Sequence, residues 1–276
     1  RARARDAAGN WSSYSGSRTF TIDTSAPTSN SISIAGGATY TTSTSVTLTL
    51  ASTGASTMKF QNDSAGYGSF EAYATSKSWT LANTQGTRTV YVIFKDAAGN
   101  PASAVNDTIV FDSVNPSAGT VNDGTGGDIS VQNSTSVINA NWTGFSDATS
   151  GIASYQWAIG TSSGGTQVMG WTSSDISGTT GEKTGLSLSN GTTYYVSVRA
   201  IDNATNTGSA ANSNGVEVDT VAPTGNSITI SGNYTTSTSV SLTLASTGAT
   251  WMSFKNDGGS YGNYEAYATS KSWTLA

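Results

Sequence analysis

The residues best suited to chemistry in this sequence are aspartates and asparagines that recur in short loops. Asp6, Asp96 and Asp202 are each followed four residues later by an asparagine, in loops of small and polar residues. Carboxylate and amide oxygens are hard ligands, and calcium binds about six to eight such oxygens. An aspartate in a tight turn can instead accept hydrogen bonds from the backbone N–H groups of its own loop. Both interpretations, calcium ligand and turn cap, remain open at the level of sequence.

Other site chemistries are restricted by composition. The chain has no cysteine and no histidine, which excludes disulfides, cysteine nucleophiles and Ser-His-Asp catalysis and removes the usual zinc and iron ligands. A glycosidase needs two facing carboxylates, whereas Glu71 and its repeat Glu265 have no second acid nearby in the sequence. We therefore expect no catalytic activity.

Charge and hydropathy limit the partners. The net charge is −5 and no basic patch is evident, which argues against binding to a nucleic-acid backbone. No apolar run approaches the length of a membrane span, about 18 residues, so we expect no membrane insertion in this segment. A cysteine-free chain of this kind fits the bacterial exterior, and we expect an extracellular or cell-surface location.

Short runs of alternating apolar and polar residues, separated by Gly and Asn turns, dominate the sequence. Residues 45–50 and 89–94 are examples, and residues 152–160 form another predicted strand. Period-two alternation over short runs is typical of half-buried strands, and regularly spaced strands indicate β-sandwiches. The predicted fold class is all-β.

Repeats divide the chain into blocks. Asp6, Asn10, Asp23 and Pro27 recur 196 residues later (202 − 6, 219 − 23) as Asp202, Asn206, Asp219 and Pro223, and residues 40–46 and 73–82 recur as 234–240 and 267–276. Repetition of this kind predicts a tandem array. The predicted blocks are a terminal hairpin at 1–24, with strands at 1–5 and 18–23, a complete unit at 25–115, a different complete unit at 116–220, and the N-terminal part of a second copy of the first unit at 221–276.

The two ends suggest alternatives. Residues 1–24 lack the rest of a sandwich, and residues 221–276 stop before the last two strands of their unit. Either this sequence is a segment of a longer polymer, which we favour, or the N-terminal hairpin of one chain completes the sandwich of another in a head-to-tail fibre.

Residues 116–220 resemble a fibronectin type III domain. Trp142 occupies the place of that family's core tryptophan, residues 188–194 match its tyrosine corner, and Tyr194, Val196, Val198 and Ala200 have the inward parity of its sixth strand. The resemblance implies that residues 1–24 are the C-terminal hairpin of another such domain.

Residues 25–115 and 221–276 resemble the bacterial Ig-like repeats of very large surface proteins. The matching residues are Asn62-Asp63, Glu71-Ala72-Tyr73, Trp79-Thr80-Leu81 and the run 90–100. Together the resemblances imply tandem immunoglobulin-like and fibronectin type III-like β-sandwiches in an extended array.

The order of strands in such sandwiches places the candidate calcium ligands at the junctions between units. The last strand ends at the C-terminal pole, and the loop before it lies at the N-terminal pole, so the acid that ends one unit should face the Asp-x-x-x-Asn loop of the next. We expect calcium at these junctions. The expected ligands are Asp23, Asp96 and Asn100 at one junction, and Asp112, Asp147, Asp202 and Asn206 at the other.

The favoured function is structural and non-catalytic, as a segment of a repetitive extracellular stalk, filament or surface adhesin. Short linkers with proline limit swing between units, and the expected partners are other repeats of the same protein, including in a homopolymeric filament. The alternative is a carbohydrate- or surface-binding module, including one accessory to a secreted polysaccharide-active enzyme. Recurrent aromatics fit sugar binding or packing: Tyr67, Phe70, Tyr73 and Trp79 return as Tyr261, Tyr264, Tyr267 and Trp273.

Overall fold

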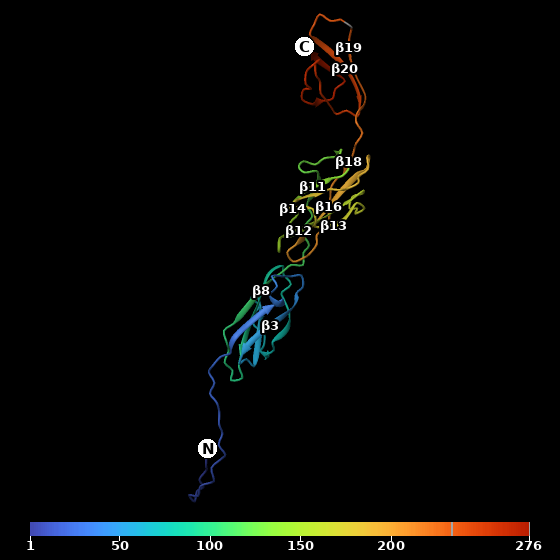
Figure 1. Cartoon of the computed structure of the whole chain (residues 1–276). Helices are drawn as coiled ribbons and strands as arrows, with labels where there is room; N and C mark the ends of the chain where they lie inside the picture. The colour runs from blue at the N-terminus through green and yellow to red at the C-terminus, as the bar shows by residue number, and fades with distance from the viewer. Residues whose placement is uncertain (233, 276) are drawn as a thin grey trace.

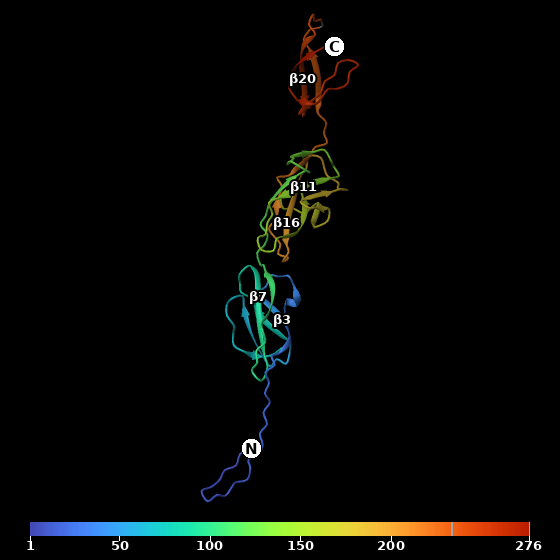
Figure 2. The ribbon, with the colours of Figure 1, turned by 90° about the vertical axis from the view of Figure 1, so that its left-hand side faces the viewer.

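The chain forms consecutive β-sheet blocks arranged end to end, as the computed structural model shows for residues 1–232 and 234–275 (Figures 1 and 2). We call residues 25–115 unit 1, residues 116–220 unit 2 and residues 221–276 unit 3. The predicted all-β class is confirmed, and the two complete units are immunoglobulin- and fibronectin type III-like sandwiches.

Unit 1 is built from two sheets that face each other. One sheet has the order β1 (Thr28–Ile34), β3 (Ser45–Thr53), β6 (Ser76–Thr80). The other has the order β2 (Tyr40–Thr41), β8 (Val105–Phe111), β7 (Gly86–Lys95), β4 (Thr57–Asn62), β5 (Glu71–Ala72). A single turn of 3-10 helix, η1 (Ala35–Gly37), joins β1 to β2.

Alternation along the strands produces the core of unit 1. In β3 every second side chain from Val46 to Leu50 is buried and the intervening ones are exposed. In β7 the buried side chains are Val90, Val92 and Phe94. Because successive side chains of a strand point to opposite faces, the two sheets enclose these residues in one apolar cluster.

Unit 2 has the same layered plan with different strand lengths. Its first sheet runs β14 (Ile176–Ser177), β15 (Thr180–Lys183), β11 (Ile138–Thr143), β9 (Thr120–Asp123). Its second runs β10 (Val131–Gln132), β18 (Val216–Val218), β16 (Thr193–Asp202), β12 (Ile152–Gly160), β13 (Met169–Thr172), with β17 (Ala211–Asn212) also paired to β16.

Two features expected from the sequence of unit 2 are confirmed. Trp142 is buried in the core beside Trp157, with ring centroids 6.5 Å apart. The Tyr194 hydroxyl accepts a hydrogen bond from the Ser189 backbone N–H at 2.8 Å, and Leu188 is buried next to it. This hydrogen bond attaches the loop before β16 to the side chain of Tyr194, the second residue of that strand.

The corner gives a direct mutational test. Replacing Tyr194 with phenylalanine keeps the ring in the core and removes only the acceptor for the Ser189 N–H group. We expect unit 2 to lose about 1–2 kcal/mol of unfolding free energy, because a part-buried donor is left without a partner. Urea unfolding followed by circular dichroism measures the loss, and a change below about 0.3 kcal/mol would contradict the structural role.

Unit 3 repeats the first strands of unit 1. It contains the sheet β19 (Thr224–Ile230), β20 (Ser239–Thr247), β23 (Ser270–Thr274) and the pair β21 (Trp251–Met252), β22 (Glu265–Ala266). Within the described part of this unit no strands correspond to β7 and β8.

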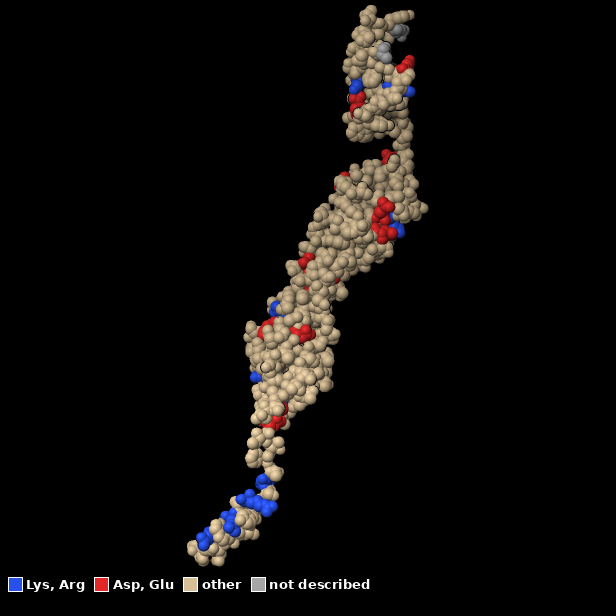
Figure 3. All heavy atoms as spheres, turned by 60° about the vertical axis from the view of Figure 1, so that its left-hand side comes forward, with Lys and Arg blue, Asp and Glu red and all other residues tan. Residues whose placement is uncertain are grey.

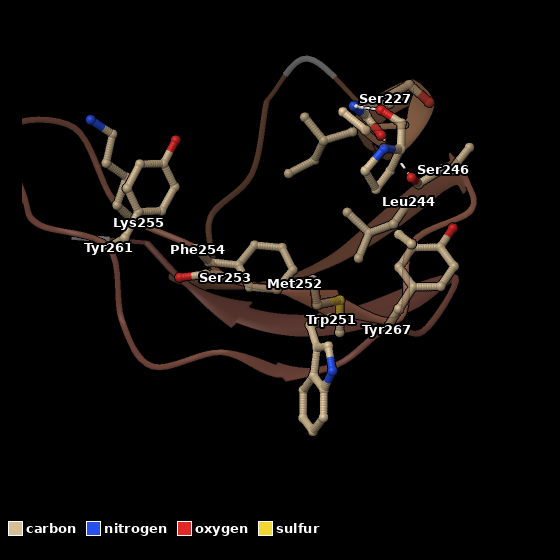
Figure 4. Close-up of a pocket in the computed structure, with 16 residues that line it drawn as sticks. Ser227, Leu244, Ser246, Trp251, Met252, Ser253, Phe254, Lys255, Tyr261 and Tyr267 are labelled. Atoms are coloured by element: carbon tan, nitrogen blue, oxygen red, sulfur yellow. Dashed lines mark hydrogen bonds between the residues drawn. The ribbon is translucent and has the colours of Figure 1, made fainter. Parts of the chain in front are cut away.

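A cavity of about 780 Å³ lies between the two sheets of unit 3 (Figure 4). Leu244, Met252 and Phe254 line it, and their counterparts in unit 1, Leu50, Met58 and Phe60, are core residues packed with β7. The cavity is therefore the surface of a core that β7 covers in unit 1, and its lining requires no ligand to explain it.

The strands expected at residues 1–5 and 18–23 are wrong. The structure has only an isolated bridge between Arg5 and Trp11 in this segment, which is almost entirely exposed. Two strands without a sheet to pack on bury too little surface to be stable. A few backbone hydrogen bonds cross the hairpin, such as that from the Ser12 N–H to the Ala4 carbonyl at 2.8 Å. Side chains add to them: the Arg3 guanidinium lies 4.2 Å from the centroid of Trp11, a cation–π contact. Arginine side chains gather on this segment, whereas the sandwiches carry few charges (Figure 3).

Within residues 1–232 and 234–275, none of the helical structure has the length and apolar character needed to cross a bilayer.

Candidate metal centre

Each linker between blocks has an aspartate followed four residues later by proline. Its carboxylate accepts a hydrogen bond from the backbone N–H two residues ahead, so the linker starts with the same turn each time. These bonds are Asp23 with Ser25 at 2.9 Å, Asp112 with Val114 at 3.0 Å, and Asp219 with Val221 at 2.8 Å.

The Asp-x-x-x-Asn loops of the two complete units also share one geometry. Asp202 accepts both the backbone N–H of Asn206 and its side-chain amide, each at 2.8 Å. Asp96 makes the same two bonds with Asn100, again at 2.8 Å. The turn-cap role is therefore present in both loops, whatever else they bind.

Each of these loops also holds the preceding block. The amide nitrogen of Asn100 donates to the carbonyl oxygen of Asp23 at 2.9 Å, and that of Asn206 donates to the carbonyl oxygen of Asp112 at 3.1 Å. We call this contact the clasp. In the clasp the asparagines present nitrogen, rather than a ligand oxygen, to the neighbouring linker.

Three carboxylates meet where unit 1 joins unit 2. Asp112 follows β8, Asp147 lies in the loop between β11 and β12, and Asp202 ends β16. One carboxylate oxygen of each lies within 4.8 Å of the others. No other trio of acidic side chains comes together in this way among the residues that the structure describes. We call these three aspartates the carboxylate cluster.

The cluster is inside the joint and its hydrogen bonding is incomplete. Asp112 is 0% exposed, and its Oδ2 is buried and accepts no hydrogen bond. Asp202 is also buried. One oxygen of Asp147 accepts the backbone N–H groups of the three residues that close its loop: Thr149 at 3.0 Å, Ser150 at 2.8 Å and Gly151 at 3.1 Å.

Electrostatics favour a positive ion between these groups. Burial acts to raise the pKa of Asp147, but the N–H groups of Ser150, Gly151 and Thr149, with the contact to Asp112, outweigh it and the pKa is lowered. The carboxylate is thus charged at neutral pH. Two ionised carboxylates about 5 Å apart repel by roughly 3 kcal/mol at an effective dielectric constant of about 20.

The geometry and donor set fit calcium. Calcium–oxygen distances are about 2.3–2.6 Å, so two ligand oxygens on opposite sides of one ion are roughly 4.8 Å apart. The separations in the cluster lie within that limit, and all three donors are hard oxygens. The unpartnered Oδ2 of Asp112 is the group that gains most from a cation.

The other expected set of ligands assembles differently. Asp23, Asp96 and Asn100 are joined by the clasp and the loop bonds, but no third carboxylate joins them among the described residues. Asp23 is exposed. The hydrogen bonds from Asn100, its side chain first, lower the pKa of Asp96. The Asp96 carboxylate is thus already stabilised by hydrogen-bond donors of its own loop.

The recurrent aromatics and charges of unit 1 serve packing. Tyr73 and Trp79 pack against the core, and the Phe70 ring lies 4.0 Å from the Lys95 ammonium on the outer face. Lys77 forms an ion pair with Glu71, and unit 3 repeats this pair with Lys271 and Glu265. The copies therefore retain contacts, which explains why these residues recur.

One buried acid in unit 2 was not anticipated from the sequence. Asp123 is 0% exposed, its Oδ2 accepts the Gly215 N–H at 3.0 Å, and its Oδ1 has no hydrogen-bond partner. Burial, opposed by bonds from Ser213 and Gly215 and reinforced by Asp128, raises the pKa of Asp123 to about 6. The only sequence signal is that Asp123 shares the inward parity of Val121 in β9.

Comparisons with known proteins assign no role to this chain. No protein-family model matches the chain, and no curated protein matches it. Among solved structures, the fibronectin(III)-like modules of Clostridium thermocellum CbhA are 14% identical with a TM-score of 0.36, over 68% of this chain and 94% of that one.

Two further solved structures are also similar. The FN1-FN3 domains of chicken CNTN1 are 15% identical with a TM-score of 0.34, over 91% of this chain and 89% of that one. The central fibronectin-III array of RIM-binding protein is 14% identical with a TM-score of 0.25, over 82% and 73%. At these TM-scores the likeness carries no argument about function.

Proposed function

We propose that this chain is a structural, non-catalytic segment of a repetitive extracellular stalk, filament or surface adhesin. Its partners are other repeats of the same protein, and its setting is the bacterial cell surface. Calcium is the proposed ligand, bound by the carboxylate cluster of Asp112, Asp147 and Asp202.

The observation that carries this proposal is the composition of the joint. Asp112 comes from unit 1, whereas Asp147 and Asp202 come from unit 2. An ion held by all three would link the units directly, in addition to the clasp between Asn206 and the Asp112 carbonyl. Such a link stiffens the array without changing the fold of either unit.

Contacts made by the linker restrict bending between unit 1 and unit 2. Pro116 is buried, and its carbonyl oxygen lies 2.6 Å from where a Cβ on Gly208 would be. Only glycine allows the unit 2 loop to approach the linker this closely. Ser113 is tied back to unit 1 through Gln85 at 3.0 Å. Contacts on both sides of the linker favour a rod over freely jointed beads.

A binding role for glycans or surfaces has less support. In unit 1 the ring of Tyr67 lies 4.9 Å from the Lys59 ammonium, and that of Phe70 lies 4.9 Å from the same group. These rings are half-buried on the sheet rather than presented as a flat exposed platform. A glycan array probed with the full chain tests this alternative, and specific binding would favour it.

Calcium titration of the full chain tests the proposed function. We expect heat of binding in calorimetry and a higher melting temperature, since a ligand at about 100 times its Kd stabilises by about 2.7 kcal/mol. Asp147→Asn should abolish calcium uptake, because the charge of the ligand is lost. The loop should keep its structure, because the amide oxygen can still accept the backbone hydrogen bonds. Glu217→Gln, which removes an exposed charge elsewhere in unit 2, is the matched control. The absence of both heat and a melting shift in the unsubstituted chain would exclude the proposal.

A further inference from the structure

We infer that the array contains two kinds of joint, one locked by a divalent cation and one that is independent of it. The joint from unit 1 to unit 2 is the locked kind, and the joint from residues 1–24 to unit 1 is the independent kind. The inference rests on the proposed function, because it assigns the calcium site to one joint and denies it to the other.

The two joints share their basic fastening. Both have the aspartate turn in the linker and the clasp from the asparagine of the following loop, at 2.9 Å in the first joint and 3.1 Å in the second. Both following loops are closed by the same bonds between aspartate and asparagine. The fastening therefore cannot be what distinguishes the joints.

The third carboxylate is the first difference. In unit 2 the loop between β11 and β12 spans residues 144–151 and carries Asp147. The corresponding loop of unit 1, between β3 and β4, is only residues 54–56, which are Gly, Ala and Ser. The short loop offers no carboxylate, so the first joint has nothing in the position of Asp147.

Burial is the second difference. Asp112 is 0% exposed and its Oδ2 lacks a partner, whereas Asp23, at the matching linker position, is exposed. Water can solvate Asp23, but the Asp112 oxygen needs a partner within the joint. A cation supplies that partner only at the second joint.

The two joints should therefore respond differently to calcium. Between residues 1–24 and unit 1, the hydrogen bonds among the described residues are the clasp and the turn bond from the Ser25 N–H to Asp23, and each such bond contributes only about 0.5–1.5 kcal/mol. That joint bends with or without the ion. The second joint becomes rigid when Asp112 of unit 1 and two aspartates of unit 2 hold the same ion.

Matched variants of the full chain test the assignment. Calorimetric titration should give one calcium per chain. Asp112→Asn should abolish uptake, and Asp23→Asn, the same substitution at the same linker position, should leave both stoichiometry and affinity unchanged within about twofold.

Distance measurements test the mechanical consequence. The chain has no cysteine, so spin labels can be placed at exposed positions with Thr87→Cys and Ser154→Cys across the second joint, or Ser17→Cys and Ser103→Cys across the first. Calcium should narrow the distance distribution of the label pair across the second joint and leave that of the pair across the first joint unchanged.

The outcomes separate the two proposals. No calcium uptake by the unsubstituted chain would overturn the proposed function and this inference with it. Two ions per chain, loss of uptake in Asp23→Asn, or narrowing of both label pairs would overturn the inference while the calcium-binding function stands.

Discussion

Replacing Asp123 with asparagine is expected to stabilise unit 2 by up to about 3 kcal/mol above pH 7, which is unusual for the loss of a native charge. The carboxyl group is 0% exposed, and its Oδ1 has no hydrogen-bond partner. Keeping this group ionised in the folded state is costly. An amide avoids that cost and can still accept the Gly215 N–H.

The pH dependence follows from the direction of the shift. Burial raises the pKa of Asp123 from 3.8 to about 6, so between these values the folded state retains a proton that the unfolded state has released. Stability from this group is fully present below about pH 4, falls as the pH rises, and levels off above about pH 6. The unsubstituted chain should therefore lose up to about 3 kcal/mol across that window, and Asp123→Asn should not.

Urea unfolding of the full chain between pH 4 and pH 8 measures this effect. Glu217→Gln is the control, because Glu217 is an exposed acid on a strand of the same unit and should leave the pH profile unchanged. An Asp123→Asn variant that is less stable than the unsubstituted chain at pH 8 would show that the carboxylate is stabilising, contrary to this prediction.

Replacing Trp157 with alanine is expected to cost unit 2 about 3–5 kcal/mol while leaving unit 1 unaffected. The side chain is fully buried, and its Nε1 donates to the Ser174 carbonyl at 2.8 Å. A Cβ on Gly181 would lie 2.9 Å from its ring, so the indole is closely packed against β15. The loss would combine a large cavity with an unpaired carbonyl.

Calorimetry of the full chain shows whether the damage stays local. The cores of units 1 and 2 are separate clusters with no shared residues, so only one transition should move, by more than about 10 °C. Trp157→Phe should show a smaller shift, since it retains most of the ring. Equal shifts in the transitions of both units would contradict the independence of the two cores.

The joints illustrate how far sequence patterns lead toward a site. Residues that cap the same kind of turn can be recognised by spacing, and the order of strands in a sandwich predicts that the end of one unit meets a loop of the next. The turn spacing and this strand order predict the meeting of Asp112, Asp147 and Asp202, which the structure shows. The hydrogen bond from Asn206 to the linker carbonyl cannot be predicted from these patterns, because side-chain orientation depends on the approach of the neighbouring unit.

Residues 1–24 show the opposite case. Alternation in residues 18–23 is as regular as in β3, yet these residues form no strand. A strand pattern has an effect only where a partner strand and a second sheet are available to bury its apolar face.

The sequence alone determined the all-β class, the repeat pattern, and the strands at residues 45–50, 89–94 and 152–160. It did so because alternation and turn residues act locally along the chain. Tertiary structure decided which of two similar linkers has a buried aspartate and a third carboxylate, since Asp147 reaches Asp112 only through a loop of another unit. It also decided that Asp123 is buried, because its partner Gly215 lies 92 residues away. Burial and charge proximity depend on neighbours in space, and spacing in one sequence does not specify them.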